Sequence, residues 1–290
     1  MEPSDDVALD TSVDDSIDIL MITYRWPRYA AASLERLLGT CDDSMKVWLW
    51  HNGTDAETLD VVRSFLDHPA IAHFHHCPQN KKLWEPTNWM WSRSRATYVA
   101  KVDDDCLVDP AWARTLRAAH RDNPKFGVIG SWRFYEEDFH PRLAQRKIET
   151  FKGGHQVMKN AWVQGSGYLM KRRCIEEQGL LPPGQPFPRY CIEVAHRGYQ
   201  NGWYFPFIHE EHLDDPRSPN TGLRSDADLL DRMPLSAQKT GVRTLKDWEA
   251  QMRLSARKVQ AANPDPRYHR GWRKKLSNAR KRIWRRTGEH

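Results

Sequence analysis

Residues 98–112 read YVAKVDDDCLVDPAW, and three consecutive aspartates follow directly after an apolar run. The run 98–102 has the length of a buried strand, so Asp103, Asp104 and Asp105 fall where that strand ends. Adjacent carboxylates repel one another, and all three ionise only where positive charge compensates them. A divalent cation that also binds phosphate oxygens is the usual compensation. The alternative is a solvated turn in which Asp105 caps the next helix.

The segments on both sides of this triplet alternate between strand and helix patterns. This order predicts an α/β fold with a single, mostly parallel central sheet flanked by helices, because parallel strands need crossover helices. Ligands bind such sheets beyond the carboxyl ends of the strands, which is where the aspartates fall. The strand patterns are 19–22, 46–52, 70–77, 98–102, 125–135, the first part of 162–179 and the middle of 188–219. The helix patterns include one that starts at 28 and is ended by Gly39, and those at 56–67, 111–122 and 244–263.

The composition of the chain divides it into four parts. We predict a disordered acidic leader over 1–16, a catalytic domain over 17–240, a C-terminal helix over 241–263 and a basic amphipathic tail over 264–290. The leader has neither the basic start nor the apolar stretch of a secretory signal, and no apolar run is long enough to span a membrane. The five cysteines are scattered without a Cys-x-x-Cys pair, which favours a reducing compartment.

Basic residues are concentrated in the tail. Residues 267–290 hold ten Lys and Arg and one Glu, which leaves 34 basic and 37 acidic residues in 1–266 out of totals of 44 and 38. Trp272, Leu276, Ala279 and Ile283 are at helical spacing among these cations, with Trp284 beside them. Such a helix suits the surface of an anionic membrane. A docked helix with a solvated face and a phosphate-binding helix are the alternatives, and the acidic body argues against nucleic acid as a partner.

Four stretches in order resemble the family 2-like glycosyltransferases, which have the nucleotide-sugar-binding GT-A fold, a Rossmann-like arrangement. They are ILMITYRWP (19–27), WHNGTD (50–55), NKKLWEPTNWMWSRSRATYVAKVDDDCLVDP (80–110) and WVQGSGYLMKR (162–172). The resemblance extends over about residues 17–215. His51 stands where the family commonly has an aspartate before the Asn-Gly of the second strand.

The resemblance implies a role for each matching residue. Asp105 would hold Mn²⁺ or Mg²⁺ against the diphosphate of the donor. The residues implied to contact the donor nucleotide are Thr23, Tyr24, Arg25, Asn52, Asn88, Asp103 and Asp104. Trp162, Ser166 and Gly167 would border the acceptor or the donor sugar.

A second polar stretch, FIHEEHLDDPRSP (207–219), follows the last strand pattern. His209 and His212 would share one face of a helix, as two metal ligands do. In the family a late histidine often completes the metal site, so we expect one of these two beside Asp105. Glu193, Glu210 and Asp214 are the candidates for the general base, and the sequence leaves the choice among them open.

Together these features predict a metal-dependent glycosyltransferase that moves a sugar from a nucleoside-diphosphate donor, with a UDP-sugar favoured, to a hydroxyl of a glycan or lipid-linked acceptor. The family implies inversion at the sugar, and the tail implies a cytoplasmic protein, peripheral on the inner face of a membrane. Two alternatives remain open: a nucleotidyltransferase or metal-dependent phosphohydrolase, and a non-enzymatic scaffold that binds membrane or RNA through its tail. The first turn has no glycine-rich phosphate loop, which disfavours the former.

Overall fold

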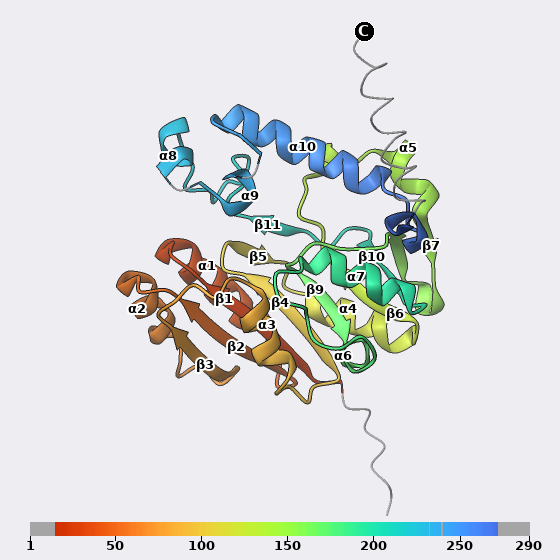
Figure 1. Ribbon diagram of the computed structural model, residues 1–290, viewed down its shortest axis with the longest axis horizontal. Helices are drawn as coiled ribbons and strands as arrows, with labels where there is room; N and C mark the ends of the chain where they lie inside the picture. The colour runs from red at the N-terminus through yellow and green to blue at the C-terminus, as the bar shows by residue number, and fades with distance from the viewer. Residues whose placement is uncertain (1–14, 232, 239, 272–290) are drawn as a thin grey trace, which may run out of the picture.

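A computed structural model describes residues 15–231, 233–238 and 240–271 (Figure 1). Over these residues the chain builds a nine-stranded sheet in the order β3-β2-β1-β4-β9-β6-β10-β8-β7. The strands are β1 (Ile17–Thr23), β2 (Met45–Asn52), β3 (Ile71–Cys77), β4 (Tyr98–Asp103), β6 (Phe126–Gly130), β7 (Ile148–Thr150), β8 (Gln156–Lys159), β9 (Tyr168–Lys171) and β10 (Gln200–Phe205).

The sheet is mostly parallel, as the sequence predicted. β1 pairs in parallel with β2 and β4, β2 with β3, and β6 with β10. β9 runs antiparallel between β4 and β6, and β8 runs antiparallel beside β10. The carboxyl ends of β1, β2 and β4 therefore meet at one edge of the sheet, and the aspartates follow β4 at this edge.

Helices cover both faces of the sheet, because alternate residues of each buried strand are apolar on opposite sides. Ile17, Ile19 and Met21 of β1 pack with one set of helices, and Leu20 and Ile22 pack with the other. The first set is α1 (Pro27–Leu38), α2 (Ala56–Ser64) and α4 (Trp112–Asp122), and the second is α3 (Trp84–Trp91), α6 (Arg172–Gln178) and α7 (Phe187–His196).

Local sequence signals set the ends of several helices. Pro27 opens α1 and Gly39 follows its last residue, while the Asp55 carboxylate caps α2 by accepting from Thr58 N at 2.9 Å. α4 begins at Trp112, seven residues beyond Asp105, and has Ala111 at its N-cap. The alternative in which Asp105 caps this helix is therefore wrong.

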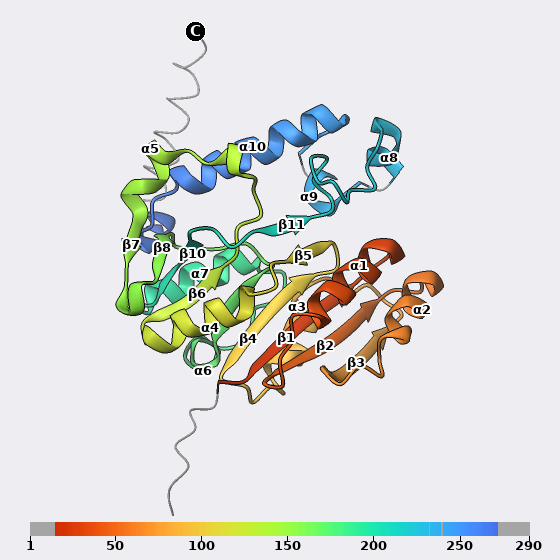
Figure 2. The same ribbon diagram turned by 180° about the vertical axis from the view of Figure 1, so that it is seen from behind.

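A small second sheet lies across the carboxyl edge of the main sheet (Figures 1 and 2). It joins β5 (Cys106–Val108), directly after the aspartates, to β11 (Glu210–His212), with His212 opposite Cys106. The short elements of the remaining chain are η1 (Glu136–Asp138), α5 (Pro141–Ala144), η2 (Gln145–Lys147), η3 (Lys152–Gly154) and η4 (Pro266–His269).

The helices that follow β11 lie on the outer side of the small sheet, away from the main sheet, in both views (Figures 1 and 2). They are α8 (Asp226–Asp231), α9 (Leu235–Gln238) and α10 (Leu245–Ala261), which falls within the predicted helix 244–263. Trp248 of α10 is buried and donates its Nε1–H to Asp214 O at 2.7 Å. Ala256 and Val259, near its C-terminal end, pack in the same hydrophobic cluster as Met158 of β8 and Trp203 of β10, so this end of α10 joins the core of the main sheet.

Most of the basic tail, from 272 onward, and residues 1–14 of the leader lie outside the described residues. The apolar positions Trp272, Leu276, Ala279, Ile283 and Trp284 are among them. Within the described part of the chain, no helix combines the length and the apolar character needed to cross a bilayer.

Candidate active site

The three aspartates point to three different partners. Asp103 ends β4 and its carboxylate accepts from Lys101 Nζ, a buried ammonium whose pKa burial lowers. The Asp104 carboxylate accepts from Tyr24 N at 2.8 Å, which ties it to the end of β1. Asp105 faces Cys106 and His212. The three carboxylates are therefore tolerated because they point to different partners. Some repulsion remains, since burial and, after it, the charge of Asp105 raise the pKa of Asp104 to about 8.

β11 brings His212 to Asp105 from more than a hundred residues away. Leu213 N donates to Asp105 O at 2.8 Å, and Cys106 pairs with His212 across the small sheet. Cys106 Sγ lies 3.4 Å from Asp105 Oδ1 and 3.4 Å from the His212 ring nitrogens, and a ligand atom from each of the three residues lies within 4.8 Å of the others. This group has the chemistry to hold a metal ion. The Cys106 thiol is protonated, because burial raises its pKa well above the usual value.

Glu210 lies beneath this group and is fully buried. It accepts from Ser166 Oγ at 2.5 Å and from Gln164 Nε2 at 2.9 Å, and its Oε2 lies 3.3 Å from His212 Nε2. Burial alone would raise the pKa of Glu210, but the contacts with His212, Ser166 and Gln164 outweigh it and lower the pKa. Glu210 is therefore an ionised residue whose contacts orient His212.

Gly167 makes room for the Glu210 carboxylate. Its φ is +60°, and a Cβ there would lie 2.6 Å from the Glu210 carboxyl carbon. Only glycine combines this backbone conformation with this close approach. Ser166 and Gly167, expected beside a sugar, are thus engaged with Glu210.

Asp214 follows β11 on the other side of His212. Its Oδ1 lies 3.9 Å from His212 Nδ1 and 3.3 Å from an Arg133 guanidinium nitrogen. Burial and the charge of Asp105 raise the pKa of Asp214. Arg133 was missed from the sequence. Its position just after the apolar strand β6, at the same edge of the sheet as the aspartates, could have identified it as a site residue.

The two histidines do not share a face, because the segment is a strand and not a helix. Residues three apart in a strand point to opposite sides. His209 instead lies beside Tyr135, with a distance of 5.4 Å between the ring centroids. The helical argument for a histidine pair is therefore wrong, and His212 alone is next to Asp105.

The residues after β1 adopt an unusual turn. Thr23 is buried and bonds His51 Nδ1 through Oγ1 at 2.9 Å. Arg25 and Trp26 both have positive φ, 59° and 62°, and the Arg25 guanidinium carbon lies 5.0 Å from the centre of the Tyr24 ring. Left-handed conformations at consecutive non-glycine residues are costly and cluster at functional sites.

Two of the predicted nucleotide contacts have their side-chain polar groups engaged elsewhere. The Asn52 side chain accepts from Trp50 Nε1 and Lys81 N, at 2.9 and 3.0 Å. The Asn88 amide exchanges two hydrogen bonds with the backbone of Leu181, at 2.8 and 2.9 Å. Both asparagines therefore fasten loops within the fold.

Two other predicted residues make their contacts with other parts of the fold. Glu193 on α7 forms ion pairs with Arg189, at 2.7 Å, and with Arg270. Among the described residues its recorded partners are those two arginines. Trp162 packs against the core, with its ring centroid 5.6 Å from that of Trp203.

A cleft of about 730 Å³ opens beside the small sheet. Its lining includes Leu107, two residues after Asp105, and Leu213, next to His212. The turn 25–29 forms one side, and the segment 219–224 forms the other. Its lining holds the arginines Arg25, Arg28 and Arg224, the acids Asp55, Glu57 and Asp231, and the aromatic rings of Trp26 and Tyr29. A cleft of this volume, with charged and aromatic groups in its lining, suits a polar ligand that carries a ring.

Comparison with known proteins gives one family match and several structural neighbours. The sequence profile described as glycosyl transferase family 2 matches residues 18–179, more than half of the chain. No curated protein matches. The mannosyltransferase PcManGT from Pyrobaculum calidifontis, in complex with GDP-Man and Mn²⁺, shares 15% identity over 92% of this chain and 80% of that one, with a TM-score of 0.56.

Two further neighbours are more distant in sequence. S. aureus TarS 1-349 in complex with UDP-GlcNAc shares 9% identity over 68% of this chain and 58% of that one, with a TM-score of 0.54. GalNAc-T7 with UDP, GalNAc and Mn²⁺ shares 10% identity over 68% and 43%, with a TM-score of 0.54. The match spans about 60% of the TarS 1-349 structures. At these identities the likeness concerns the fold.

Proposed function

Since this chain belongs to glycosyl transferase family 2, we propose that it transfers a sugar from a nucleoside-diphosphate donor to a hydroxyl of an acceptor. The predictions of this family and of the GT-A fold are confirmed. The observation that carries the proposal is the convergence of Asp105 and His212 at the carboxyl edge of the sheet. Family membership favours sugar transfer over the phosphohydrolase and scaffold alternatives.

A divalent cation fits the residues present. Asp105 raises the pKa of both Asp104 and Asp214, so the site carries negative charge that a cation would offset. Asp105 and His212 would hold Mn²⁺ or Mg²⁺, while the protonated Cys106 thiol is a poor ligand for these ions. An ion held there would stabilise the charge that develops on the leaving nucleoside diphosphate. PcManGT and GalNAc-T7 are in complex with Mn²⁺, which supports the same class of cofactor here.

The donor nucleotide would lie at the end of β1, against the turn formed by Tyr24 and Arg25, with Asp103 and Asp104 beneath it. The cleft beside Leu107 and Leu213 supports this placement through its arginines. The complexes of TarS with UDP-GlcNAc and of PcManGT with GDP-Man support a nucleotide-sugar donor. We favour a UDP-sugar, following the family resemblance.

The reaction would be an inverting displacement. The acceptor hydroxyl attacks the anomeric carbon, the bond from that carbon to the diphosphate breaks, and a carboxylate takes the hydroxyl proton. Asp214 is the base we favour, because it lies beside His212 and, unlike Glu210, is not held by Ser166 and Gln164. Glu210 is fully enclosed and acts by positioning His212, and Glu193 lies with its arginines. The anomeric configuration of the product, read by NMR, tests inversion.

The acceptor would be a glycan or a lipid-linked glycan at the inner face of an anionic membrane. The support is the basic composition of 267–290, with ten Lys and Arg. Salt-sensitive co-sedimentation with anionic vesicles, compared between the full chain and a chain ending at Pro266, tests this localisation.

The function is tested by thermal unfolding with UDP- and GDP-sugars, with and without Mn²⁺. A ligand at a hundredfold excess over its Kd adds about 2.7 kcal/mol of stability. We expect stabilisation by one nucleotide sugar that depends on Mn²⁺ and is absent in Asp105→Asn. Stabilisation that ignores the metal would contradict the assignment of Asp105.

A further inference from the structure

Cys106 is the member of the candidate active site that the proposed reaction does not use. Its side chain is fully buried, and its Sγ lies 3.4 Å from Asp105 Oδ1 and 3.4 Å from both ring nitrogens of His212. Within the described part of the chain, these three residues are the one group of three or more such side chains that could hold a metal ion. Carboxylate and water suit Mn²⁺ and Mg²⁺, whereas a thiolate selects zinc. The sulfur therefore gives this group a preference of its own.

The spacing of the donor atoms matches a tetrahedral zinc site. With Zn–S bonds of about 2.3 Å and Zn–N or Zn–O bonds of about 2.0–2.1 Å, a sulfur and a neighbouring ligand atom lie roughly 3.5 Å apart. Both distances from Cys106 Sγ, at 3.4 Å, agree with this value. The ligand atoms of Asp105 and His212 lie within 4.8 Å of each other. Asp105 is partly exposed, so rotation of its side chain can close the remaining gap.

The surroundings of His212 determine which of its nitrogens would bind the ion. Nε2 lies 3.3 Å from Oε2 of the fully buried Glu210. A histidine that binds zinc usually donates its other ring N–H to a carboxylate or carbonyl, which fixes the tautomer and the orientation of the ring. Nδ1 is then the ligand atom, and Asp214 Oδ1 lies 3.9 Å from it. Asp214 or a water molecule would complete the tetrahedron.

We propose that Asp105, Cys106 and His212 form a zinc-binding site in which Cys106 binds as a thiolate, and that zinc held there inhibits the enzyme. As the Zn–S bond forms, the thiol proton passes to the solvent. The carboxylate and the thiolate together neutralise Zn²⁺, whereas Mn²⁺ held by Asp105 and His212 alone keeps one positive charge for the diphosphate. Zinc would therefore fill the cation position without serving the donor. The inhibition rests on the proposed sugar transfer, and the binding does not.

Cobalt substitution tests the thiolate contact directly. Co²⁺ occupies the tetrahedral sites of zinc and, unlike the d¹⁰ ion Zn²⁺, gives thiolate-to-metal charge-transfer absorption in the near ultraviolet. The full chain is titrated with Co²⁺ in the absence of nucleotide. We expect this absorption to saturate at a single Co²⁺ per chain, to disappear when Zn²⁺ is added, and to be absent in Cys106→Ser.

Zinc and manganese affinities should respond differently to Cys106→Ser. Losing a contact that supports a metal ligand costs about 10- to 100-fold in affinity, so losing the ligand itself should weaken zinc binding by at least roughly a hundredfold. Competition with a chromophoric chelator measures this change. Mn²⁺ affinity, measured by electron paramagnetic resonance of the free ion, should change by less than about threefold, because sulfur is a poor ligand for Mn²⁺. Asp105→Asn should weaken both ions, and it remains informative if Cys106→Ser fails to fold.

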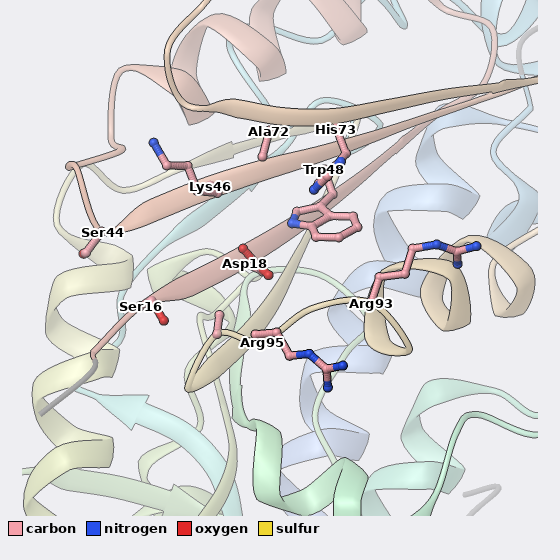
Figure 3. Close-up of a pocket in the computed structure, with 10 residues that line it drawn as sticks. Ser16, Asp18, Ser44, Lys46, Trp48, Ala72, His73, Arg93 and Arg95 are labelled. Carbon is pink, nitrogen blue, oxygen red and sulfur yellow. The ribbon is translucent and has the colours of Figure 1, made fainter.

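Two control variants account for zinc bound elsewhere on the chain. Cys77 on β3 is a partly exposed thiol. His73 on the same strand is exposed, and Figure 3 shows it beside Trp48 in a cleft of about 480 Å³ at the opposite edge of the sheet from the aspartates. Cys77→Ser and His73→Ala should both keep the cobalt absorption and the zinc affinity of the wild type.

Three binding results would overturn the proposal. They are no charge-transfer absorption in the wild type, absorption that is lost in Cys77→Ser, and an equal loss of zinc and manganese affinity in Cys106→Ser. Inhibition is measured separately, as the Zn²⁺ concentration that halves each variant's own transfer rate. We expect this concentration to rise at least roughly tenfold in Cys106→Ser, and an unchanged value would overturn the inhibition. The binding measurements contain neither donor nor acceptor, so their outcome is independent of whether the chain transfers sugar.

Discussion

The two edges of the main sheet differ in how many partners a buried carboxylate has. At the carboxyl edge, Glu210 is fully buried and has three polar partners, drawn from the segment before β9 and from β11. At the amino edge, Asp18 is almost as buried and has no recorded partner among the described residues. The carboxyl edge is a preorganised network in which each group orients another, whereas the amino edge keeps groups open.

Asp105→Asn should produce the largest effect, because it removes a carboxylate charge at the carboxyl edge of the sheet, where a cation would bind. We expect sugar transfer to fall by roughly a thousandfold, comparable to the loss of one preorganised catalytic contact, while thermal unfolding stays close to wild type. Donor turnover against Mn²⁺ concentration measures it. Asp109→Asn is the matched control, since Asp109 lies just beyond β5 and bonds Ala111 N. Full activity of Asp105→Asn at low Mn²⁺ would remove the metal-ligand role.

Gly167→Ala should break the packing of the same network. The new Cβ would meet the Glu210 carboxyl carbon at 2.6 Å and would hold a φ of +60°. We expect a loss of about 2–4 kcal/mol in unfolding free energy, from overpacking and backbone strain together. Gly165→Ala is the control two residues away, because no atom lies within 4 Å of its Cβ position. Urea unfolding of both variants measures this difference. Equal unfolding midpoints would show that the Glu210 side chain moves aside at little cost in free energy.

Substituting each histidine in turn should show which of the two contributes to metal binding. Because His212 faces Asp105 and His209 faces Tyr135, only His212→Ala should raise the Mn²⁺ concentration needed for half-maximal activity, by roughly 10- to 100-fold. His209→Ala serves as the control on the neighbouring position. A metal requirement that shifts equally in both variants would mean that the strand geometry does not select His212.

Asp18→Asn should have the smallest effect and should sharpen the contrast between the edges. The substitution removes no recorded contact, so we expect the unfolding free energy to change by less than about 1 kcal/mol and donor turnover to stay unchanged. Glu210→Gln, which disrupts bonds to a buried charge, should cost about 2–3 kcal/mol. Chemical denaturation compares the two acids directly. A cost for Asp18→Asn as large as that for Glu210→Gln would mean that the Asp18 carboxylate has a structural role.

Sequence alone predicted strands β1 to β4 and helices α1, α2 and α4 in their order. The apolar run before Asp103 became β4, and the strand–helix alternation predicted the α/β fold with its central sheet, while the GT-A assignment came from the family resemblance. These features depend on contacts within a few residues, which propensity and periodicity record. The family resemblance also followed from contiguous motifs.

Tertiary structure decided which polar residues meet. His212 reaches Asp105 only because β11 pairs with β5 across a hundred residues, and that pairing makes the segment a strand where its spacing suggested a helix. Asn88 hydrogen-bonds the backbone of Leu181, and Glu193 forms ion pairs with two arginines. No local sequence pattern reveals these partners. Arg133 entered the site from the end of β6, opposite Asp214. Long-range strand pairing and burial choose among chemically equivalent side chains, because each unpaired buried group is costly and the fold retains the arrangement that pairs most of them.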